Sequence, residues 1–216
     1  MMTEIFCRDN FFTDHDIKYI NQVIAAKEPG QDARHSYGRF PNQLLANYIN
    51  LINDSEFINW MTNRIQIIFD RDIQIQTAIR VKLYLPWDIH SDFFLDQCST
   101  GYCPYYNCLI PLDNVPSQTI IFNQTTSGSN DFYRYKETAS KVDSPISQEF
   151  WDQHLDFCWP EDRLYLTLKQ LMPYQSIGQI QGFPRQYFHS SDNFHTRVKD
   201  SKSFIQLRID CKHDSS

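Results

Sequence analysis

Hydrophobic residues recur with a helical period in the first third of the chain. Residues 13–28 place Ile17, Ile20 and Ile24 on one face, behind a threonine that can cap a helix. Residues 41–52, with a proline at the start, and residues 54–71, with a similar apolar stripe, are predicted as two further helices. The N-terminal part is therefore expected to be helical.

The pattern then changes to strict alternation. Residues 73–85 alternate isoleucine, valine and leucine with polar residues, which predicts a long strand with one buried face. Shorter segments of the same kind follow it, and we predict strands at residues 105–112, 117–123, 177–183, 185–191, 194–198 and 203–211.

Residues 131–176 interrupt this series. Their spacing is helix-like, and prolines at 160 and 173 divide and end it. The sequence thus predicts one α+β domain with a mainly β core at residues 73–124 and 177–211. Residues 1–72 would be a helical buttress, and residues 125–176 an insertion that could act as a lid.

Composition narrows the class of protein. The 216 residues carry a net charge of -6, which disfavours a nucleic-acid or anionic membrane surface and leaves a small molecule as the expected partner. The six cysteines form no CxxC pair, so reduced thiols are the simplest interpretation. The sequence contains no signal peptide and no apolar run of transmembrane length, so a cytoplasmic protein is expected.

The candidate chemistry begins with His90 and Asp92, just after the long strand. Residues two apart on extended backbone point to the same side, and an imidazole with a carboxylate suits Fe(II). A third ligand from a distant segment would complete a two-histidine, one-carboxylate site. His189 and His195, both in the late β block, are the candidates.

The chain resembles the Fe(II)/2-oxoglutarate-dependent oxygenases, in the broad group that includes phytanoyl-CoA and prolyl hydroxylases. The resemblance lies at both ends and in the middle of the chain and does not cover residues 125–176. The segments that carry it are IFCRDNFFTDHDIKYINQVI, RVKLYLPWDIHSDF, YYNCLIPLDN, RQYFHSSDNFHTRV and SKSFIQLRID.

The resemblance implies a double-stranded β-helix (a jelly-roll, cupin-like core) that holds Fe(II) and uses 2-oxoglutarate and O2. It implies His90, Asp92 and His195 as the catalytic metal ligands. His189 would then be a buried neighbour of the site, and an exchange of the roles of His189 and His195 is the alternative.

The resemblance also implies a cation for the C5 carboxylate of 2-oxoglutarate. Lys202 stands where the family commonly has arginine, Phe204 where it has a small hydroxyl residue, and Arg208 where it has a second arginine. Arg208 is slightly favoured, because it lies in an apolar run whereas Lys202 borders a turn; Arg197 is a third option. Tyr84 and Asn107 fall where the family places hydrogen-bond donors to this cosubstrate.

The implied function is hydroxylation of a small molecule with release of succinate and CO2. Two alternatives remain at this stage. One is a cupin-like metalloenzyme that does not use 2-oxoglutarate, and the other is a catalytically inactive binding domain on the same fold. The prime substrate and the oligomeric state do not follow from the sequence.

Overall fold

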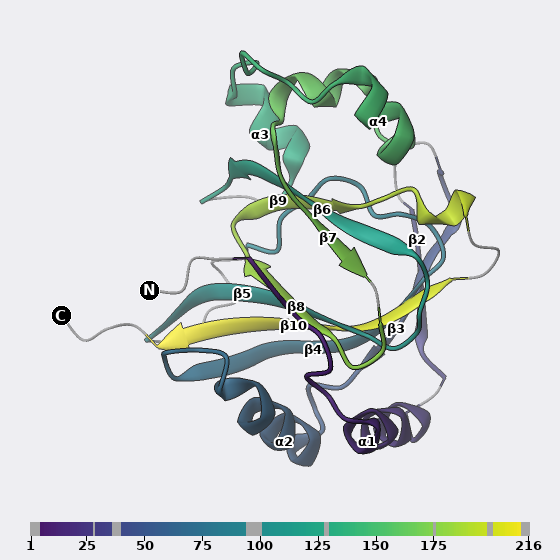
Figure 1. Ribbon diagram of the computed structural model, residues 1–216, viewed down its shortest axis with the longest axis vertical. Helices are drawn as coiled ribbons and strands as arrows, with labels where there is room; N and C mark the ends of the chain where they lie inside the picture. Colours follow the sequence, from purple (N-terminus) through teal and green to yellow (C-terminus); the bar gives the residue numbers. More distant parts are fainter. Residues whose placement is uncertain are drawn as a thin grey trace.

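Two antiparallel sheets form the centre of this computed structural model, which describes residues 5–27, 29–35, 40–93, 101–127, 130–174, 176–197 and 201–212 (Figure 1). The larger sheet has the order β1 (Phe6–Arg8), β8 (Ile180–Pro184), β5 (Tyr102–Pro111), β10 (Lys202–Lys212), β4 (Ile73–Leu83), β3 (Leu44–Asn50), β2 (Gln31–Arg34). The smaller sheet has the order β7 (Leu168–Tyr174), β6 (Ser117–Thr125), β9 (Tyr187–Ser191). The prediction of a mainly β protein is confirmed.

Two helices cover the outer face of the larger sheet (Figure 1). In α1 (Asp14–Ala25), Thr13 and Asp16 form a reciprocal capping box, and in α2 (Ser55–Gln66) the Asp54 side chain caps the first turn. Their apolar faces pack against β4, β5 and β10 in one buried cluster. The prediction of helices within residues 13–28 and 54–71 is therefore confirmed.

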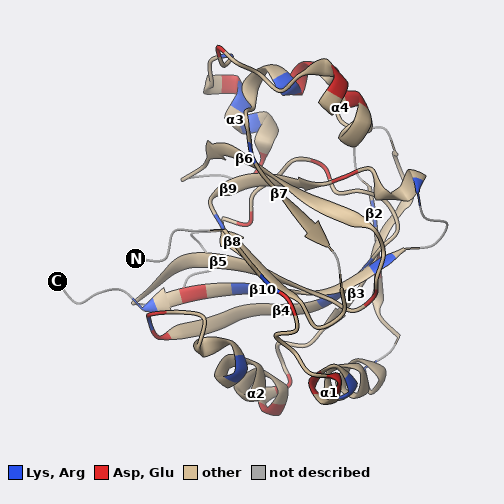
Figure 2. Ribbon diagram, viewed as in Figure 1, with Lys and Arg blue, Asp and Glu red and all other residues tan. Residues whose placement is uncertain are grey.

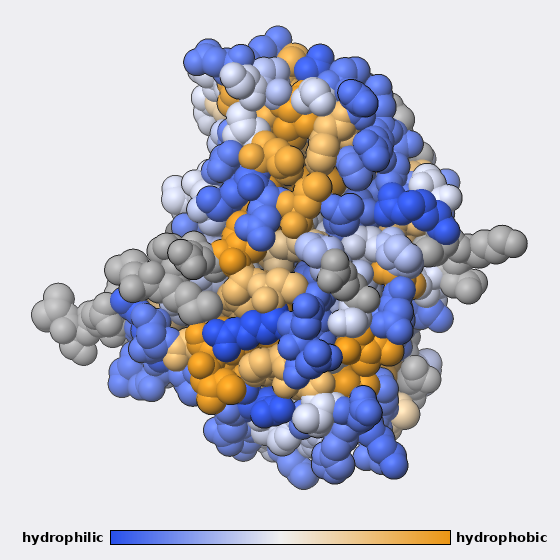
Figure 3. Space-filling model, in the orientation of Figure 1, coloured by the Kyte–Doolittle hydropathy of each residue, from blue (hydrophilic) through white to orange (hydrophobic). Residues whose placement is uncertain are grey.

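A second cluster lies between the two sheets, and a third lies beneath the helices at the opposite end of the molecule. That end carries α3 (Phe132–Thr138), α4 (Gln148–His154) and the short helix η2 (Pro160–Tyr165), whose apolar residues pack with those of β6 and β9 (Figure 1). In Figure 3, hydrophobic side chains reach the surface in a band between these helices and the larger sheet.

Strand β10 is the strand that serves the site. It pairs antiparallel with both β4 and β5, and its side chains alternate between two surroundings. Ile205, Leu207 and Ile209 join the cluster under α1 and α2, whereas Lys202 and Phe204 face the space between the sheets. Acidic and basic residues both occur near its C-terminal end (Figure 2).

Three predicted elements are wrong. Residues 44–50, predicted as helix, form β3, because pairing with β4 buries Leu45, Ala46 and Ile49 better than an isolated helix could. Residues 168–174, also predicted as helix, form β7 on β6. Residues 194–196, predicted as strand, form the one-turn helix η3 (Phe194–Thr196).

Within the described parts of the chain, no helix combines the length and the apolarity that crossing a membrane requires.

Candidate metal centre

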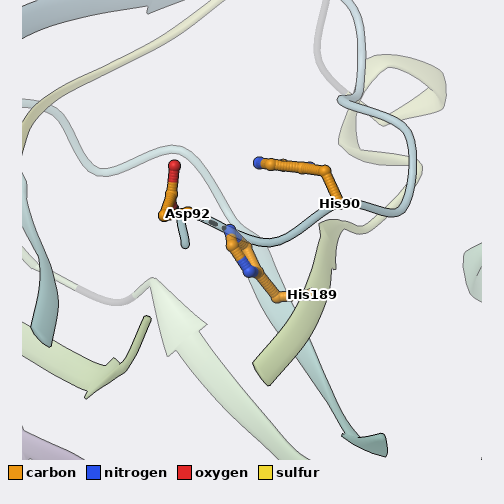
Figure 4. Close-up of side chains that lie close together, drawn as sticks. All are labelled: His90, Asp92 and His189. Atoms are coloured by element: carbon orange, nitrogen blue, oxygen red, sulfur yellow. Dashed lines mark ion pairs between the residues drawn. The ribbon is translucent and has the colours of Figure 1, made fainter. Parts of the chain in front are cut away.

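His90, Asp92 and His189 come together between the two sheets. One ligand atom from each lies within 4.8 Å of the others, and Figure 4 shows both imidazole rings beside the Asp92 carboxylate. His90 and His189 exchange main-chain hydrogen bonds in an antiparallel bridge (3.0 and 2.8 Å), which places their rings 4.3 Å apart. Two distant segments are thus fixed against each other at the site.

Both histidines are oriented as metal ligands usually are. Nδ1 of His90 lies 2.7 Å from the carbonyl oxygen of Asp88, and Nδ1 of His189 lies 3.2 Å from that of Tyr187. A carbonyl can only accept, so Nδ1 is the donor in each ring and Nε2 is the nitrogen that points to the cluster. This hydrogen bond from the far nitrogen is the arrangement that orients a metal-binding imidazole.

Asp92 is held ionised. Burial alone would raise its pKa, but the adjacent Arg208 guanidinium opposes burial and the pKa is held well below its usual value. Arg208 donates to Oδ1 from Nε (3.0 Å) and Nη2 (2.8 Å), while Oδ2 accepts from Gln206 (3.0 Å) and lies 3.3 Å from Nε2 of His189. The carboxylate therefore presents Oδ2 to the histidines.

His90 is neutral at physiological pH. Burial lowers its pKa to about 4, and the neighbouring His189 acts in the same direction. A neutral imidazole and an ionised carboxylate are the protonation states that metal binding requires. The donor set thus fits a divalent first-row metal such as Fe(II).

His195 lies elsewhere and, among the described residues, is not a member of the cluster of possible ligands. Its ring packs edge-on against Phe40 (5.3 Å between centroids) and Phe157 (6.5 Å), and burial lowers its pKa. Of the two candidate distal ligands, the structure thus brings His189, and not His195, together with His90 and Asp92. Sequence spacing could not decide this, because the bridge between His90 and His189 determines which histidine meets the pair.

A cavity extends from the two histidines along the inner face of β10. It is lined by Trp87, His90, Asn107, Leu109, Thr119, Tyr174, His189, Ser190, Ser191, Lys202, Phe204 and Gln206. Lys202, Phe204 and Gln206 are alternate residues of β10, so one face of the strand lines the cavity along its length.

Lys202 lies at the end of this face of β10 that is farther from the metal cluster. It is 3% exposed, and its ammonium donates to Ser117 Oγ (3.3 Å) and lies over the rings of Tyr174, Phe194 and Phe204. Burial lowers its pKa to about 8. Among the residues that the structure describes, no carboxylate forms an ion pair with it. Asp192 and Asp113 act on the ammonium only from beyond ion-pair distance and raise its pKa less than burial lowers it. A buried cation without a direct anionic partner is costly.

Two amides lie between Lys202 and the metal cluster. Gln206 donates to Asn107 Oδ1 (3.3 Å) as well as to Asp92, whereas Nδ2 of Asn107 and Oε1 of Gln206 have no hydrogen-bond partner among the described residues. Both side chains are almost fully buried. Gln206 was missed in the sequence, although its shared parity with Lys202 and Arg208 could have indicated it.

The remaining predicted cosubstrate residues lie apart from this cavity. Arg208 contacts Asp92, and Arg197 pairs with Asp192. The ring of Tyr84 lies under the ammonium of Lys82 (5.6 Å), and Tyr84 is not among the described residues that line the cavity.

A second cavity opens on the other side of the His90–Asp92 segment. It is lined by Trp87, Ile89, His90, Ser91, Asp92, Asn130, Asp131, Phe132, Tyr133 and Arg208. Trp87 and His90 line both cavities, of which the first leads to Lys202 and the second to the start of α3.

Comparison with known proteins identifies the fold. No protein-family model matches the sequence, and no curated protein is significantly similar to it. Among solved structures, the epimerase SnoN from nogalamycin biosynthesis, which is α-ketoglutarate dependent, superposes with a TM-score of 0.62 at 8% identity, covering 96% of this chain and 78% of SnoN. The α-ketoglutarate-dependent carbocyclase SnoK superposes with a TM-score of 0.55 at 8% identity (97% and 80% covered).

HygX from Streptomyces hygroscopicus, with nickel, 2-oxoglutarate and hygromycin B bound, superposes with a TM-score of 0.53 at 10% identity (97% and 83% covered). SnoN has also been solved with Fe3+, α-ketoglutarate and nogalamycin RO. The fold of this chain is therefore the fold of iron- and 2-oxoglutarate-dependent oxygenase-family enzymes, and the predicted resemblance is confirmed.

Proposed function

We propose that this protein is an Fe(II)- and 2-oxoglutarate-dependent dioxygenase that hydroxylates a small molecule and releases succinate and CO2. The observation that carries the proposal is the buried ammonium of Lys202, which lies without a carboxylate partner in the cavity that His90 and His189 also line. A dicarboxylate that binds metal at one end and needs a cation at the other matches this arrangement.

His90, Asp92 and His189 would hold the metal. The two Nε2 atoms and Asp92 Oδ2 are the donor atoms, because each Nδ1 faces a carbonyl oxygen and Asp92 Oδ1 is bound by Arg208. When bound, iron with 2-oxoglutarate supplies the oxidative chemistry that activates O2. The chain's own residues orient the ligands and keep the carboxylate ionised.

Lys202 would bind the C5 carboxylate of 2-oxoglutarate, in place of the arginine that the family commonly uses. Ser117 is positioned to share that carboxylate, since its hydroxyl already contacts the ammonium. Nδ2 of Asn107, a buried donor without a partner, would donate to the cosubstrate nearer the metal. Arg208 has a different role and restrains Asp92.

The second cavity, between His90 and the start of α3, would admit the prime substrate. Its aromatic and polar lining suits a small organic molecule. Residues 125–176, most of which lie over the smaller sheet, would act as the lid of a single oxygenase domain in a double-stranded β-helix. SnoN and HygX have been solved with small organic molecules, which supports this class of substrate.

An anaerobic titration tests the proposal. Fe(II) is added to the full-length chain with and without 2-oxoglutarate, and the visible metal-to-ligand charge-transfer absorption of the chelate is recorded. We expect the absorption only when both are present, and we expect Lys202→Met to require far more 2-oxoglutarate to develop it. Tight iron binding that never gives this absorption would exclude 2-oxoglutarate as the cosubstrate.

A further inference from the structure

Asp92 needs external support, because it lies outside every strand. The segment that carries it follows β4, and its pairing consists of two isolated bridges at His90, to Asp131 and to His189. A metal-binding carboxylate must be held to within roughly 0.5 Å of its productive position. Arg208 and Gln206 restrain its side chain. Something else must hold its backbone.

Arg185 holds that backbone from both sides. The main-chain N–H of Asp92 donates to the carbonyl oxygen of Arg185 (3.2 Å), and Nε of Arg185 donates to the carbonyl oxygen of Asp92 (2.7 Å). One residue thus satisfies both polar backbone groups of the metal-binding aspartate.

Arg185 is itself anchored to the larger sheet. Its main-chain N–H donates to the carbonyl oxygen of Tyr105, and its Nη1 lies 2.5 Å from Oδ1 of Asp210 on β10. Arg185 is 1% exposed and Asp210 is 0% exposed. The chain of contacts therefore runs from the sheet, through a fully buried ion pair, to the backbone of Asp92.

Stability alone does not explain this pair. Burying two charges is expensive, and apolar residues of similar volume often replace such a pair without loss of stability. Oδ2 of Asp210 also lacks a hydrogen-bond partner among the described residues, so the pair is not a fully satisfied network. The guanidinium geometry is useful for another reason, because Nε and Nη1 donate to two different partners at once.

We infer that Arg185 and Asp210 are positioning residues that fix the backbone of Asp92 for metal binding. The inference rests on the proposed function, since it presupposes that Asp92 is a ligand. Loss of the pair is expected to weaken metal affinity by roughly 10–100-fold, as loss of a ligand's supporting hydrogen bonds commonly does.

The test measures Co(II) and Fe(II) affinity of the full-length chain by calorimetry, together with the visible spectrum of the Co(II) form and the melting temperature of the metal-free form. Arg185→Lys keeps the charge but loses the rigid planar guanidinium that directs Nε and Nη1 to the two partners. The double variant Arg185→Met/Asp210→Leu removes both charges, so it retains a fold even where a single change leaves an unpaired buried charge. Asp210→Asn removes the charge but keeps an acceptor for Nη1. Its metal affinity should stay near that of the wild type, because the hydrogen bond orients Arg185.

Arg64→Met is the matched control. Arg64 pairs with Asp16 between α2 and α1, so its loss should lower the melting temperature and leave Co(II) affinity unchanged. We expect both Arg185 variants to lose affinity and to shift the Co(II) absorption bands. Wild-type affinity and spectrum in a folded Arg185 variant would overturn the inference alone. A wild-type chain that binds neither ion would overturn the proposed function as well.

Discussion

His90 and His189 are hydrogen-bonded partners across an antiparallel bridge, although 98 positions separate them in the sequence. Each donates its main-chain N–H to the other's carbonyl oxygen, so their side chains emerge on the same face. Asp92 follows two residues later on the same side and meets His189 at 3.3 Å. The metal cluster is therefore a consequence of backbone pairing as much as of side-chain chemistry.

Replacing His189 should abolish metal binding, whereas replacing His195 should not. We expect His189→Ala to reduce Fe(II) affinity by more than the roughly 10–100-fold that loss of a ligand's hydrogen-bond partner causes. His195→Ala is the control, since that ring packs among phenylalanines away from the cluster. Calorimetric titration with Fe(II) under anaerobic conditions checks both. Retention of tight binding by His189→Ala would refute the ligand assignment.

Lys202 and Arg208 should have separable effects. Lys202→Met is expected to weaken 2-oxoglutarate binding by about 2–5 kcal/mol, the range for truncating one partner of a buried charge pair. Metal affinity and the fold should survive, because an unpaired buried ammonium opposes folding. Arg208→Met should instead weaken metal affinity, since it releases Asp92 Oδ1. Titrations of metal alone, then of 2-oxoglutarate at saturating metal, distinguish the two; the opposite assignment predicts the reverse order.

Affinity for 2-oxoglutarate should fall as the solution becomes alkaline. The pKa of Lys202 in the free protein is lowered to about 8, chiefly by burial, and a bound carboxylate would raise it again. The charged form that binds the carboxylate is thus fully present below pH 8 and is lost above it. The dissociation constant should then rise by up to about tenfold per pH unit until the pKa of the complex is reached. Lys202→Met should show a flat profile over this range.

A loss of packing in the cluster beneath α1 and α2 should lower stability without changing metal affinity. Phe57 of α2 is fully buried against the larger sheet, and Phe57→Ala should reduce the free energy of unfolding by about 3–5 kcal/mol. Metal affinity of the folded fraction should not change, because the cluster lies on the opposite side of that sheet. Chemical denaturation and metal titration of the same preparation measure the two effects. A parallel loss of metal affinity would mean that the helices support the site directly.

The strands that alternate cleanly were predictable, and so was the proximity of the side chains of His90 and Asp92. The local hydrophobic pattern predicted the wrong secondary structure where pairing with another strand decides it. Residues 44–50 carry enough leucine and isoleucine for either state, and pairing with β4 selects the strand. The choice between His189 and His195 depends on pairing in the same way, because the spacing from a family pattern does not encode the bridge between His90 and His189. No sequence pattern indicated a role for Arg185 and Asp210 beside the candidate metal site, since that role depends on contacts with backbone atoms of Asp92.

Strand β10 sets the distance between the ammonium of Lys202 and the residues that hold the Asp92 carboxylate. Lys202 lies toward one end, Gln206 and Arg208 restrain the metal-binding carboxylate farther along, and each step between alternate side chains is about 6.6–6.8 Å. If the protein binds 2-oxoglutarate as proposed, the strand defines the length of diacid that can reach from the metal to the ammonium. Deleting one residue between Phe204 and Gln206 would do more than shorten that reach. With Gln206 kept in register, it would turn Lys202 and Phe204 to the face on which Ile205 and Leu207 lie and bring Ser203 to the cavity, because a shift of one residue exchanges the two faces of a strand.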